Sequence, residues 1–407
     1  MQHLRVIIFN MANYNLIITG GGAAGCFSAI IAAEQGAKVL LIETGRLLHK
    51  LMITGKGRCN LTNNSGTETI LQNVKTNPRF LQSSLSRFTS ADTMAFFENL
   101  GVRLKTERGN RVFPVSDSAN EIVAALNKRM EILGVEIIKD RARAIIIKDG
   151  TVRGVKCEKG SYCAPKLILA TGGLSYPKTG STGDGYKLAA ALGHTVIKPK
   201  AALVPIETRE DVSELAGLTL KNVKLSAADY AEQGELLFTH FGISGPLALT
   251  ASCYIHDIPC KIEIDLKPAL DEKKLDLRLL RDFAENRNKQ IINALGALLP
   301  KSIIPFVINA ANIQPGKQVN AVTAAERARL LAAVKTFPLT AAGLRPIEEA
   351  VITDGGIDVR EINPKNMESK LIKGLRFAGE VIDVAAFTGG FNLQIAFSTA
   401  YAAVTVD

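Results

Sequence analysis

The sequence contains no tryptophan, and only 6% of its 407 residues are aromatic. Its lysines and arginines are scattered, with no dense basic block interleaved with aromatic side chains, and this pattern favours a solvated surface over a nucleic-acid-binding segment. No run reaches about 18 uninterrupted apolar residues, so we expect no transmembrane helix. We therefore predict a small-molecule substrate rather than a nucleic acid or a membrane as partner, and the oligomeric state stays open.

Metal and disulfide chemistry have no sequence signature either. The six cysteines include no C-x-x-C pair, which argues against a dithiol redox centre and a zinc site, and no H-E-x-x-H or clustered histidines occur. We predict no metal and free thiols, as in a reducing compartment. The N-terminus lacks the length and cleavage pattern of a signal peptide, so we expect a cytoplasmic protein. Because Met11 directly precedes the first strand pattern, residues 1–10 are interpreted as an extension from an upstream start.

The composition is that of a globular protein: 47% of residues are hydrophobic, and the net charge is +10. A basic balance attracts anions such as dinucleotides but does not select among them. Alternating strand and helix patterns predict an α/β fold: a split Rossmann-type domain with an inserted β-barrel-like domain and a small helical domain. We place the split domain at residues 1–193 and 340–407, the β-rich insertion at 194–270 and the helical subdomain at 271–339.

The same patterns predict the individual elements. We expect strands over 16–19, 38–43, 144–147, 152–157, 167–170 and 375–378, helices over 26–35 and 392–403, a long loop over 46–66, and a largely helical region over 76–134.

The first strand, helix and second strand form a βαβ unit that carries Gly20-x-Gly22-x-x-Gly25. The first glycine of this motif permits the tight turn, the second lets a pyrophosphate approach the backbone, and the third lets helix and strand pack closely. The helix N-terminus offers free N–H groups to the phosphates. Glu43 ends the second strand, where an acid bonds ribose hydroxyls. The spacing and its context predict a dinucleotide site.

Later segments favour FAD over NAD as that dinucleotide. The strand ending in Thr171-Gly172-Gly173 and a third one ending in Gly379-Glu380-x-x-Asp383 bring backbone towards the cofactor again. The segment 388–394 opens the last helix, whose N-terminus can face the flavin N1–C2=O edge, where negative charge collects on reduction. A domain that binds NAD does not require these later segments of the chain to come back to the cofactor.

At this point the sequence resembles a known family. The motifs GKGRCNLTNN (55–64), RVFPVSDSA (111–119), ATGGLSYPKTGSTGDGYKLA (170–189), LVPIET (203–208), LFTHFGISGP (237–246) and the segment 362–403 are similar to those of the HI0933-like (YhiN/BaiN) flavoproteins, a family of NAD(P)/FAD-dependent oxidoreductases. The resemblance runs from about residue 14 to 403. Two departures stand out: the chain ends in AAVTVD without the usual terminal glycine, and Lys56 stands where the family commonly has a further glycine.

The resemblance implies non-covalent FAD and the same three-part division, and it leaves the substrate open. It implies FAD contacts by Gly20, Gly22, Ala23, Ala24, Glu43, Arg58, Cys59, Asn60 and Leu61, a main-chain contact near Ala144, and contacts by Gly379, Asp383, Gly390, Asn392 and Leu393. Neighbours in the same motifs complete the predicted cofactor-binding set: Gly25, Thr44, Gly57, Thr171, Gly172 and Glu380.

Two side chains are candidate proton donors or acceptors. Tyr176 follows a strand in a loop where α/β sheets place their sites, although a tyrosine before Pro177 can equally pack the turn. His240 lies between a strand and a glycine turn of the insertion, where a structural role is an equally good interpretation. Arg58 can contact flavin or phosphate or be an exposed loop residue, and Cys59 is interpreted as a backbone-contact residue because no partner cysteine is near.

The predicted function is that of an FAD-dependent oxidoreductase, which transfers hydride between flavin N5 and a small organic substrate. Only one dinucleotide fingerprint is present, so NAD(P)H would act as a transient reductant. Two alternatives remain. A flavin-dependent nucleic-acid-modifying enzyme would show basic residues clustered around the flavin mouth, and a non-catalytic redox-sensing flavoprotein would show no substrate preference.

Overall fold

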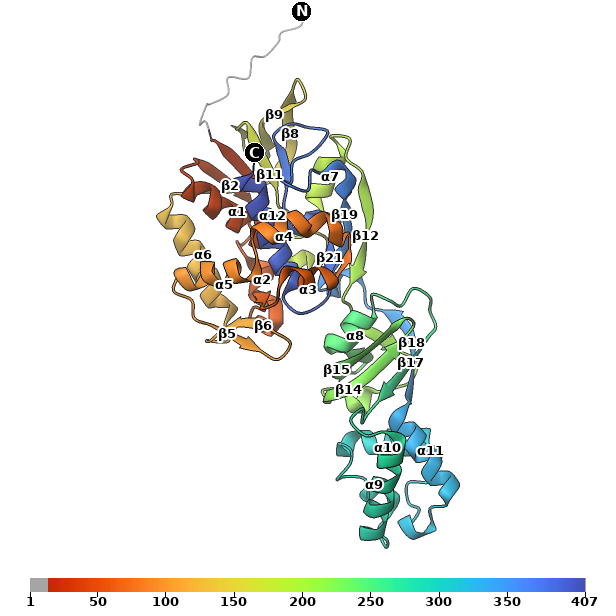
Figure 1. Cartoon of the computed structure of the whole chain (residues 1–407). Helices are drawn as coiled ribbons and strands as arrows, with labels where there is room; N and C mark the ends of the chain where they lie inside the picture. Colours follow the sequence, from red (N-terminus) through yellow and green to blue (C-terminus); the bar gives the residue numbers. More distant parts are fainter. Residues whose placement is uncertain (1–13, 407) are drawn as a thin grey trace, which may run out of the picture. The chain divides into compact units, whose positions relative to one another are not determined.

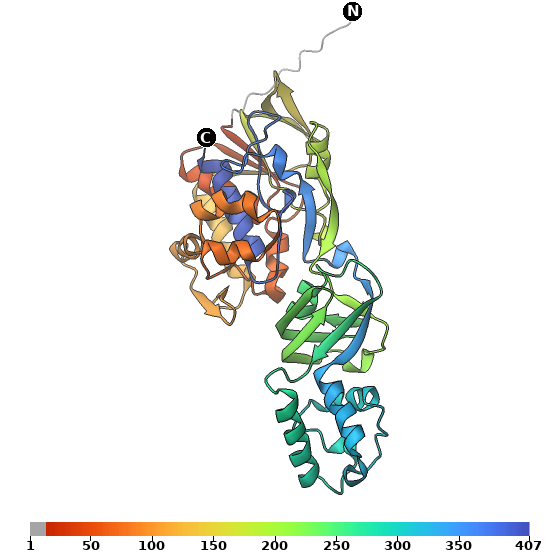
Figure 2. The same cartoon turned by 45° about the vertical axis from the view of Figure 1, so that its right-hand side comes forward.

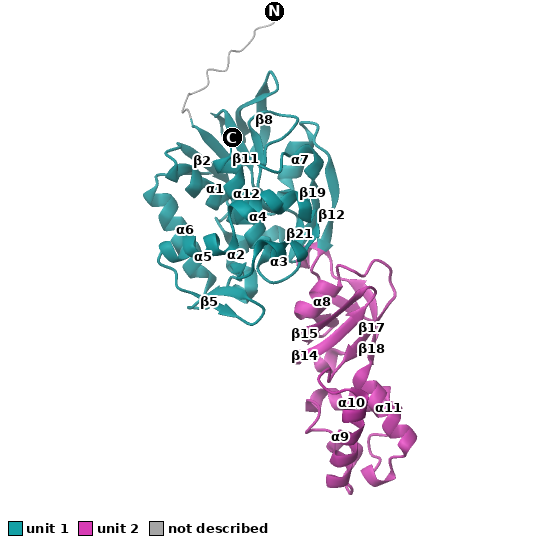
Figure 3. Cartoon of the chain, viewed as in Figure 1, with its two compact units in different colours: residues 1–201, 351–407 teal, residues 202–350 magenta. Residues whose placement is uncertain are grey.

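The computed structural model describes residues 14–406, so the predicted extension over residues 1–10 lies outside the described part. Within that range the chain forms two compact units, residues 14–201 with 351–406 and residues 202–350 (Figure 3). Each unit has a hydrophobic core of its own. The segment predicted as a helical domain, 271–339, lies within the second unit, and its status as a separate domain stays a prediction.

The first unit is built on a five-stranded parallel sheet in the order β20-β11-β1-β2-β7. Its inner strands are short runs of Val, Ile and Leu that are buried along their length, as expected where helices cover both faces of a parallel sheet. The order places the strand from near the C-terminus beside β11, which itself pairs with the first strand. The strands are β1 (Leu16–Thr19), β2 (Val39–Glu43), β7 (Glu136–Lys139), β11 (Lys166–Leu169) and β20 (Leu375–Phe377).

Two apolar helices from opposite ends of the sequence pack side by side against this sheet: α1 (Ala23–Glu34) and α12 (Phe391–Thr405), as Figure 1 shows. Gln394, a fully buried polar side chain of α12, has hydrogen-bond partners for both its oxygen and its nitrogen. The Gln394 oxygen accepts hydrogen bonds from Thr62 and Thr93, and its nitrogen donates to Phe88 O and Ser398. The sequence-based prediction of a split domain whose two ends meet therefore has a direct structural basis in this helix pair.

The first unit contains further elements around the sheet. Its other helices are α2 (His49–Ile53), α3 (Thr67–Gln72), α4 (Gln82–Arg87), α5 (Ser90–Asn99), α6 (Ala119–Ile132) and α7 (Asp184–Ala190). Its other strands are β3 (Thr62–Asn63), β4 (Val74–Thr76), β5 (Leu104–Glu107), β6 (Arg111–Pro114), β8 (Ala142–Lys148), β9 (Thr151–Cys157), β10 (Ser161–Cys163), β12 (Val196–Ala202), β19 (Ile352–Ile357) and β21 (Ala385–Ala386). The strands expected over 144–147 and 152–157 correspond to β8 and β9, which pair antiparallel on either side of Asp149 and Gly150.

The expectation of a largely helical region over 76–134 is wrong in its middle. Residues 104–114 form the antiparallel hairpin β5–β6, and β6 also pairs with β3. The hairpin turns at Gly109 and Asn110, whose φ angles of 75° and 57° lie in the left-handed region and stop a helix there. The Gly109-Asn110 pair is the sequence signal for this turn.

The second unit is a closed six-stranded barrel in the order β13-β16-β15-β14-β17-β18 with three helices at one end, as Figure 2 shows. The barrel and its helices share one core. These three helices, α9 to α11, are inserted between β17 and β18, so the strand that closes the barrel comes from beyond the helical segment, and a fourth helix, α8, lies between β16 and β17. The elements are β13 (Ile206–Thr208), β14 (Thr219–Ala227), β15 (Tyr230–Thr239), β16 (Gly242–Ser244), α8 (Gly245–Ala251), β17 (Cys260–Asp265), α9 (Glu272–Glu285), α10 (Ile304–Ala310), α11 (Ala324–Lys335) and β18 (Phe337–Leu344).

A buried histidine ties two segments of the first unit together. The His194 ring lies between Glu361, 3.1 Å from Nδ1, and the Ser369 hydroxyl, 2.9 Å from Nε2. The Ser369 oxygen already accepts from the amides of Leu371 and Ile372, so its proton is directed at Nε2. Nε2 is then an acceptor, and Nδ1–H donates to Glu361, which makes the ring neutral.

This ring makes the stability of the first unit depend on pH. Burial lowers the pKa of His194, against the opposing effect of Glu361. Because the folded state binds a proton less readily than the unfolded state, the histidine's contribution is complete above its ordinary pKa of about 6.5 and is lost as the pH falls towards the lowered folded value. We expect His194→Gln to flatten this part of the stability profile in denaturant titrations between about pH 5 and pH 7.5. An unchanged slope would contradict the neutral-ring assignment.

Candidate FAD-binding site

The glycine fingerprint forms the turn from β1 into α1, and its three glycines meet different surroundings. A Cβ at Gly20, whose φ is +101°, would lie 2.4 Å from Ala170 O, and a Cβ at Gly25 would lie 1.8 Å from Gly20 O. A Cβ at Gly22 would meet nothing within 4 Å. Two positions are thus closed by backbone, and the third faces open space, where a pyrophosphate can reach the backbone.

The start of α1 is suited to an anion. Gly22 is its N-cap, no side chain caps it, and its first turn carries no acidic residue. The backbone amides of Ala23, Ala24 and Gly25 therefore keep their donor capacity and the positive end of the helix dipole for a ligand.

The acid at the end of β2 lies at the same turn. The Glu43 carboxylate accepts hydrogen bonds from the Gly21 amide at 2.6 Å and the Gly45 amide at 2.7 Å, and the Thr44 hydroxyl lies 3.2 Å from it. An acceptor held here can bond ribose hydroxyls, as the spacing predicts.

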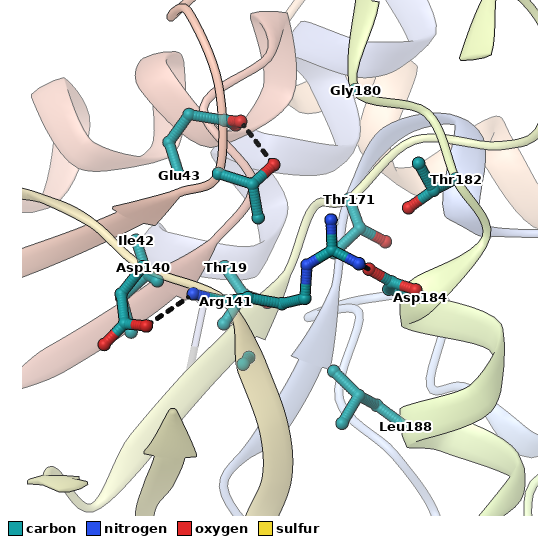
Figure 4. Close-up of a pocket in the computed structure, with 13 residues that line it drawn as sticks. Thr19, Ile42, Glu43, Asp140, Arg141, Thr171, Gly180, Thr182, Asp184 and Leu188 are labelled. Atoms are coloured by element: carbon teal, nitrogen blue, oxygen red, sulfur yellow. Dashed lines mark hydrogen bonds and ion pairs between the residues drawn. The ribbon is translucent and has the colours of Figure 1, made fainter. Parts of the chain in front are cut away.

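Beside the fingerprint is a hollow, which Figure 4 shows. The Arg141 guanidinium and the Asp184 carboxylate form an ion pair across it at 3.3 Å. It is lined by Thr19, Gly20, Ile42, Glu43, Thr44, Asp140, Arg141, Ala142, Thr171, Gly180, Thr182, Asp184 and Leu188. The predicted main-chain contact, Ala144, is exposed on β8, two residues beyond Ala142, which does line the hollow.

The hollow contains an unsatisfied donor. The Thr171 hydroxyl is buried and has no hydrogen-bond partner among the described residues. A buried hydroxyl without a partner is destabilising by about 1–3 kcal/mol, so a bound group that pairs with it gains that amount. Gly172 follows with φ +70° and turns the chain away from β11. The open backbone at Gly22, the helix start, Glu43 and Thr171 together fit an extended dinucleotide.

A second group of predicted residues gathers at the start of α12. A Cβ at Gly390, whose φ is +96°, would lie 2.3 Å from Thr62 O and 3.0 Å from the side chain of Asn60. The Asn63 amide donates to Gly389 O at 2.9 Å. The loop after α2 and the turn before α12 are thus in contact, and α12, which begins at Phe391, carries Leu393 in its first turn.

Several predicted cofactor residues instead use their side chains within the protein. Asn392 bonds both the amide and the carbonyl of Ala386, at 3.0 and 2.7 Å. Asn77 donates to the Asp383 carboxylate at 2.9 Å. Gly379 packs on α1, where a Cβ would lie 2.8 Å from the Ala24 Cβ. These residues shape the backbone around the site.

Glu380 belongs to a buried network that no local sequence pattern predicts. Its carboxylate accepts from Lys50 Nζ at 2.6 Å, from the Ser175 hydroxyl at 2.8 Å and from the Thr353 amide at 2.8 Å. Burial alone would raise the pKa of Glu380, but the Lys50 charge and these donors more than offset it and hold it below the ordinary value. Four distant segments therefore meet at one ion pair.

The loop after α2 contains the remaining predicted residues. Cys59 is fully buried with φ +59°, and burial raises its pKa to about 12, so it is a protonated packing residue. Leu61 donates its amide to Val112 O, and Gly57 has φ +82°. The Arg58 guanidinium pairs with Glu107 and Asp117 and lies 4.1 Å from the centre of the Phe113 ring.

The two candidate proton donors lie in different units. Tyr176 is partly buried with φ +51°, just before Pro177 in the loop that also carries Ser175. His240 is exposed in the turn between β15 and β16 of the second unit, with its ring 4.9 Å from that of Phe241. Their catalytic roles stay predictions.

The described residues form no metal site, no disulfide and no membrane-spanning helix. Over residues 14–406, no group of three or more His, Cys, Asp or Glu side chains is placed to hold a metal ion. All six cysteines are free thiols. No helix in the same range has both the length and the apolarity to span a membrane.

We call the open backbone at Gly22, the start of α1, Glu43 and Thr171 the dinucleotide cradle. The fold and this cradle define an FAD-dependent oxidoreductase with a Rossmann-type domain. The chain belongs to the HI0933-like family, because the model of the HI0933-like protein Rossmann domain matches residues 14–406.

Two curated relatives and a solved structure are similar over nearly their full length. The ribosomal RNA dihydrouridine synthase of Escherichia coli (strain K12) is 31% identical over 401 residues, which cover 96% of this chain and 97% of the relative. The 3-dehydro-bile acid delta(4,6)-reductase of Clostridium scindens is 28% identical over 407 residues, 95% of this chain and 97% of the relative. The 3-ketosteroid-Δ4-(5α)-dehydrogenase of Rhodococcus jostii RHA1 superposes with a TM-score of 0.54 at 15% identity, over 98% of this chain and 97% of that one, which shows the shared fold.

Proposed function

We propose that this protein reduces a carbon–carbon double bond conjugated to a carbonyl group, and that its substrate is a uracil ring in ribosomal RNA. One observation supports this above the others. The two full-length relatives bear names for reactions of one kind, since making dihydrouridine from uridine and reducing a 4,6-unsaturated 3-ketone both add two hydrogens to a double bond conjugated to a carbonyl. The RNA relative is the more similar of the two, at 31% against 28% identity.

The reaction balances with a nicotinamide nucleotide as the electron source. The carbon β to the carbonyl would accept a hydride, which is the chemistry that reduced FAD would supply when bound. The α carbon would take a proton, and the oxidation of NAD(P)H to NAD(P)⁺ would be the source of the two electrons. A transient visit of the nicotinamide fits the single dinucleotide fingerprint.

The chain's own residues prepare this chemistry at the two ends of the cradle. The amides at the start of α1 would hold the pyrophosphate, Glu43 would hold the ribose, and the Thr171 hydroxyl would pair with the dinucleotide. The turn at Gly389 and Gly390 presents the start of α12, whose positive dipole end stabilises the negative charge of a reduced flavin. Tyr176 is the proton donor we favour, because it lies in the first unit with the cradle.

Absorbance and product analysis test this function together. We expect the purified protein, or protein reconstituted with FAD, to show bands near ~370 and ~450 nm that bleach anaerobically with NADH or NADPH. Incubation with in vitro transcribed ribosomal RNA should then restore the flavin bands and add 2 Da to a uridine in nuclease digests analysed by mass spectrometry.

A 4-ene-3-ketosteroid serves as the comparison substrate. Reoxidation by the steroid but not by RNA would keep the reaction class and overturn the RNA assignment. Failure of both substrates to reoxidise a bleached flavin would overturn the reaction itself.

A further inference from the structure

The loop after α2 and the β5–β6 hairpin form a basic surface, which we call the basic rim and define as residues 54–58 and 103–117. It carries six cations, Lys56, Arg58, Arg103, Lys105, Arg108 and Arg111, against two carboxylates, Glu107 and Asp117. The rim therefore has a net charge of +4, a large share of the +10 of the whole chain.

Strand pairing joins this rim to the flavin end of the cradle. In the three-stranded sheet β3-β6-β5, Asn63 pairs directly with Arg111. The Asn63 amide donates both to Gly389 O, in the turn before α12, and to Gly109 O, at the tip of the hairpin. Neighbouring strands are about 4.8 Å apart, so the hairpin lies one strand away from the turn that faces the flavin. The loop also lies close to the hairpin, since a Cβ built at Gly55 would be 3.4 Å from the Phe113 ring.

Half of the positive charge is already compensated or stacked. Arg58 and Lys105 each form an ion pair with Asp117 at 2.6 Å. Arg58 and Arg111 lie 4.1 and 5.9 Å from the centre of the Phe113 ring. These contacts build the rim and fix its shape.

The other three cations of the rim have no carboxylate partner. Lys56, Arg103 and Arg108 are exposed, and none has a carboxylate oxygen within 4.0 Å in the described part of the chain. These three cations lie around the neutralised ion pairs of Arg58 and Lys105. Several exposed cations spread over one surface suit a polymer with many negative charges better than a single anion.

Lys56 is held in an unfavourable backbone conformation. Its φ is +59°, between Gly55 at +58° and Gly57 at +82°. The left-handed conformation is destabilising by about 1–2 kcal/mol for a residue with a Cβ, and glycine would avoid it. Strain of this kind is concentrated at functional sites. The loop therefore presents Lys56 as an exposed cation in spite of this backbone strain.

We propose that the basic rim binds the phosphate backbone of single-stranded RNA on either side of the uridine that is reduced. This inference rests on the proposed function. It names the surface that holds the substrate, with Lys56, Arg103 and Arg108 as phosphate contacts. Such contacts position the RNA without selecting its sequence.

The test compares two charge-matched triple variants by fluorescence anisotropy with a fluorescein-labelled oligouridine. The rim variant is Lys56→Gln, Arg103→Gln and Arg108→Gln. The control is Lys148→Gln, Arg153→Gln and Lys156→Gln, three exposed cations without a carboxylate within 4.0 Å in the described range. The control residues lie on β8 and β9, at the opposite end of the first unit from β5 and β6 in Figures 1 and 2.

Loss of three phosphate contacts should lower the slope of log K against log salt by about 2 for the rim variant and weaken binding at least ~10-fold, because each contact to a single strand contributes about 0.7 to the slope. The control should bind like the wild type. Both should retain the flavin spectrum and melting temperature, which shows that they fold.

The outcomes separate this inference from the proposed function. Equal affinity of rim variant and wild type, equal losses in both variants, or no RNA binding by the wild type would overturn the rim as the RNA site. Wild-type protein that binds RNA through the rim but forms no dihydrouridine would leave the rim in place and overturn the proposed substrate.

Discussion

Gly25→Ala protein is expected to purify without FAD and to unfold more easily than the wild type. A Cβ at this position would lie 1.8 Å from Gly20 O and 3.0 Å from Gly20 C, both backbone atoms that no rotamer change can move. Helix α1 must therefore shift away from β1, which shifts the amides that hold the pyrophosphate. Forced insertion of a methyl group into close packing costs about 1–3 kcal/mol and sometimes more. The ratio of flavin to protein absorbance and the melting temperature measure the two effects.

Two other glycines serve as references for this substitution. Gly66 has φ −65°, and a Cβ there meets nothing within 4 Å, so Gly66→Ala should change neither readout. A Cβ at Gly22 also meets nothing within 4 Å, and its φ is −82°, so Gly22→Ala should keep the melting temperature of the apoprotein yet lose FAD, because the added methyl fills the approach of the pyrophosphate. Stoichiometric FAD in the Gly25→Ala protein would refute the close-packing argument.

The cradle could be predicted because its signals are local in sequence. The fingerprint, Glu43 and the buried strand before Thr171 each combine a backbone requirement with a residue type within a few positions. The predicted fold class, a split Rossmann-type domain with a barrel-like insertion, is confirmed. The main-chain contact near Ala144 stays a prediction. Ala142 is the residue that lines the hollow, because the residue of a strand that faces a site depends on where the chain bends into the sheet.

The features that could not be predicted depend on contacts between residues that are far apart in the sequence. Glu380 was predicted as a cofactor contact because it follows Gly379, yet its partner Lys50 is 330 residues away. The closing barrel strand β18 lies beyond a helical segment of about 70 residues, so no local pattern could assign it to the barrel. Four of the basic rim's six cations lie in one segment, residues 103–111, but only the pairing of β3 with β6 shows that this segment lies beside the turn before α12. The basic rim is the feature that we expected of a nucleic-acid-modifying flavoenzyme.

The second large effect is a loss of stability, which we expect when the Lys50–Glu380 ion pair is broken. Lys50 Nζ donates to Glu380 at 2.6 Å and also to the Ser175 hydroxyl at 2.6 Å, and the two charged side chains are about a fifth exposed, at 22% and 21%. Lys50→Met leaves the Glu380 carboxylate without its counter-charge. Removing one partner of a fully buried pair costs 3–5 kcal/mol, and partial exposure reduces this to roughly 2–3 kcal/mol of unfolding free energy here. Denaturant titration of the first unit measures the loss.

A double-mutant cycle shows whether the effect comes from the stranded charge or from lost packing. Adding Glu380→Gln to Lys50→Met removes the charge but keeps the acceptor for Ser175 and the Thr353 amide, so the double variant should recover most of the stability. If the double variant is instead as unstable as the sum of the single ones, the ion pair does not hold these segments.

FAD retention should follow the same order as stability in this cycle. The network fixes the backbone of residues 174–175 through Thr353 Oγ1, which accepts from both amides, and Gly379, next to Glu380, packs directly on the start of α1. Loss of the Lys50 charge therefore loosens two segments near the fingerprint, residues 174–175 and the turn at Gly379. We expect the Lys50→Met protein to lose FAD on gel filtration, and the double variant to keep it. Full FAD retention by a destabilised Lys50→Met protein would show that the ion pair supports the fold without positioning the cradle.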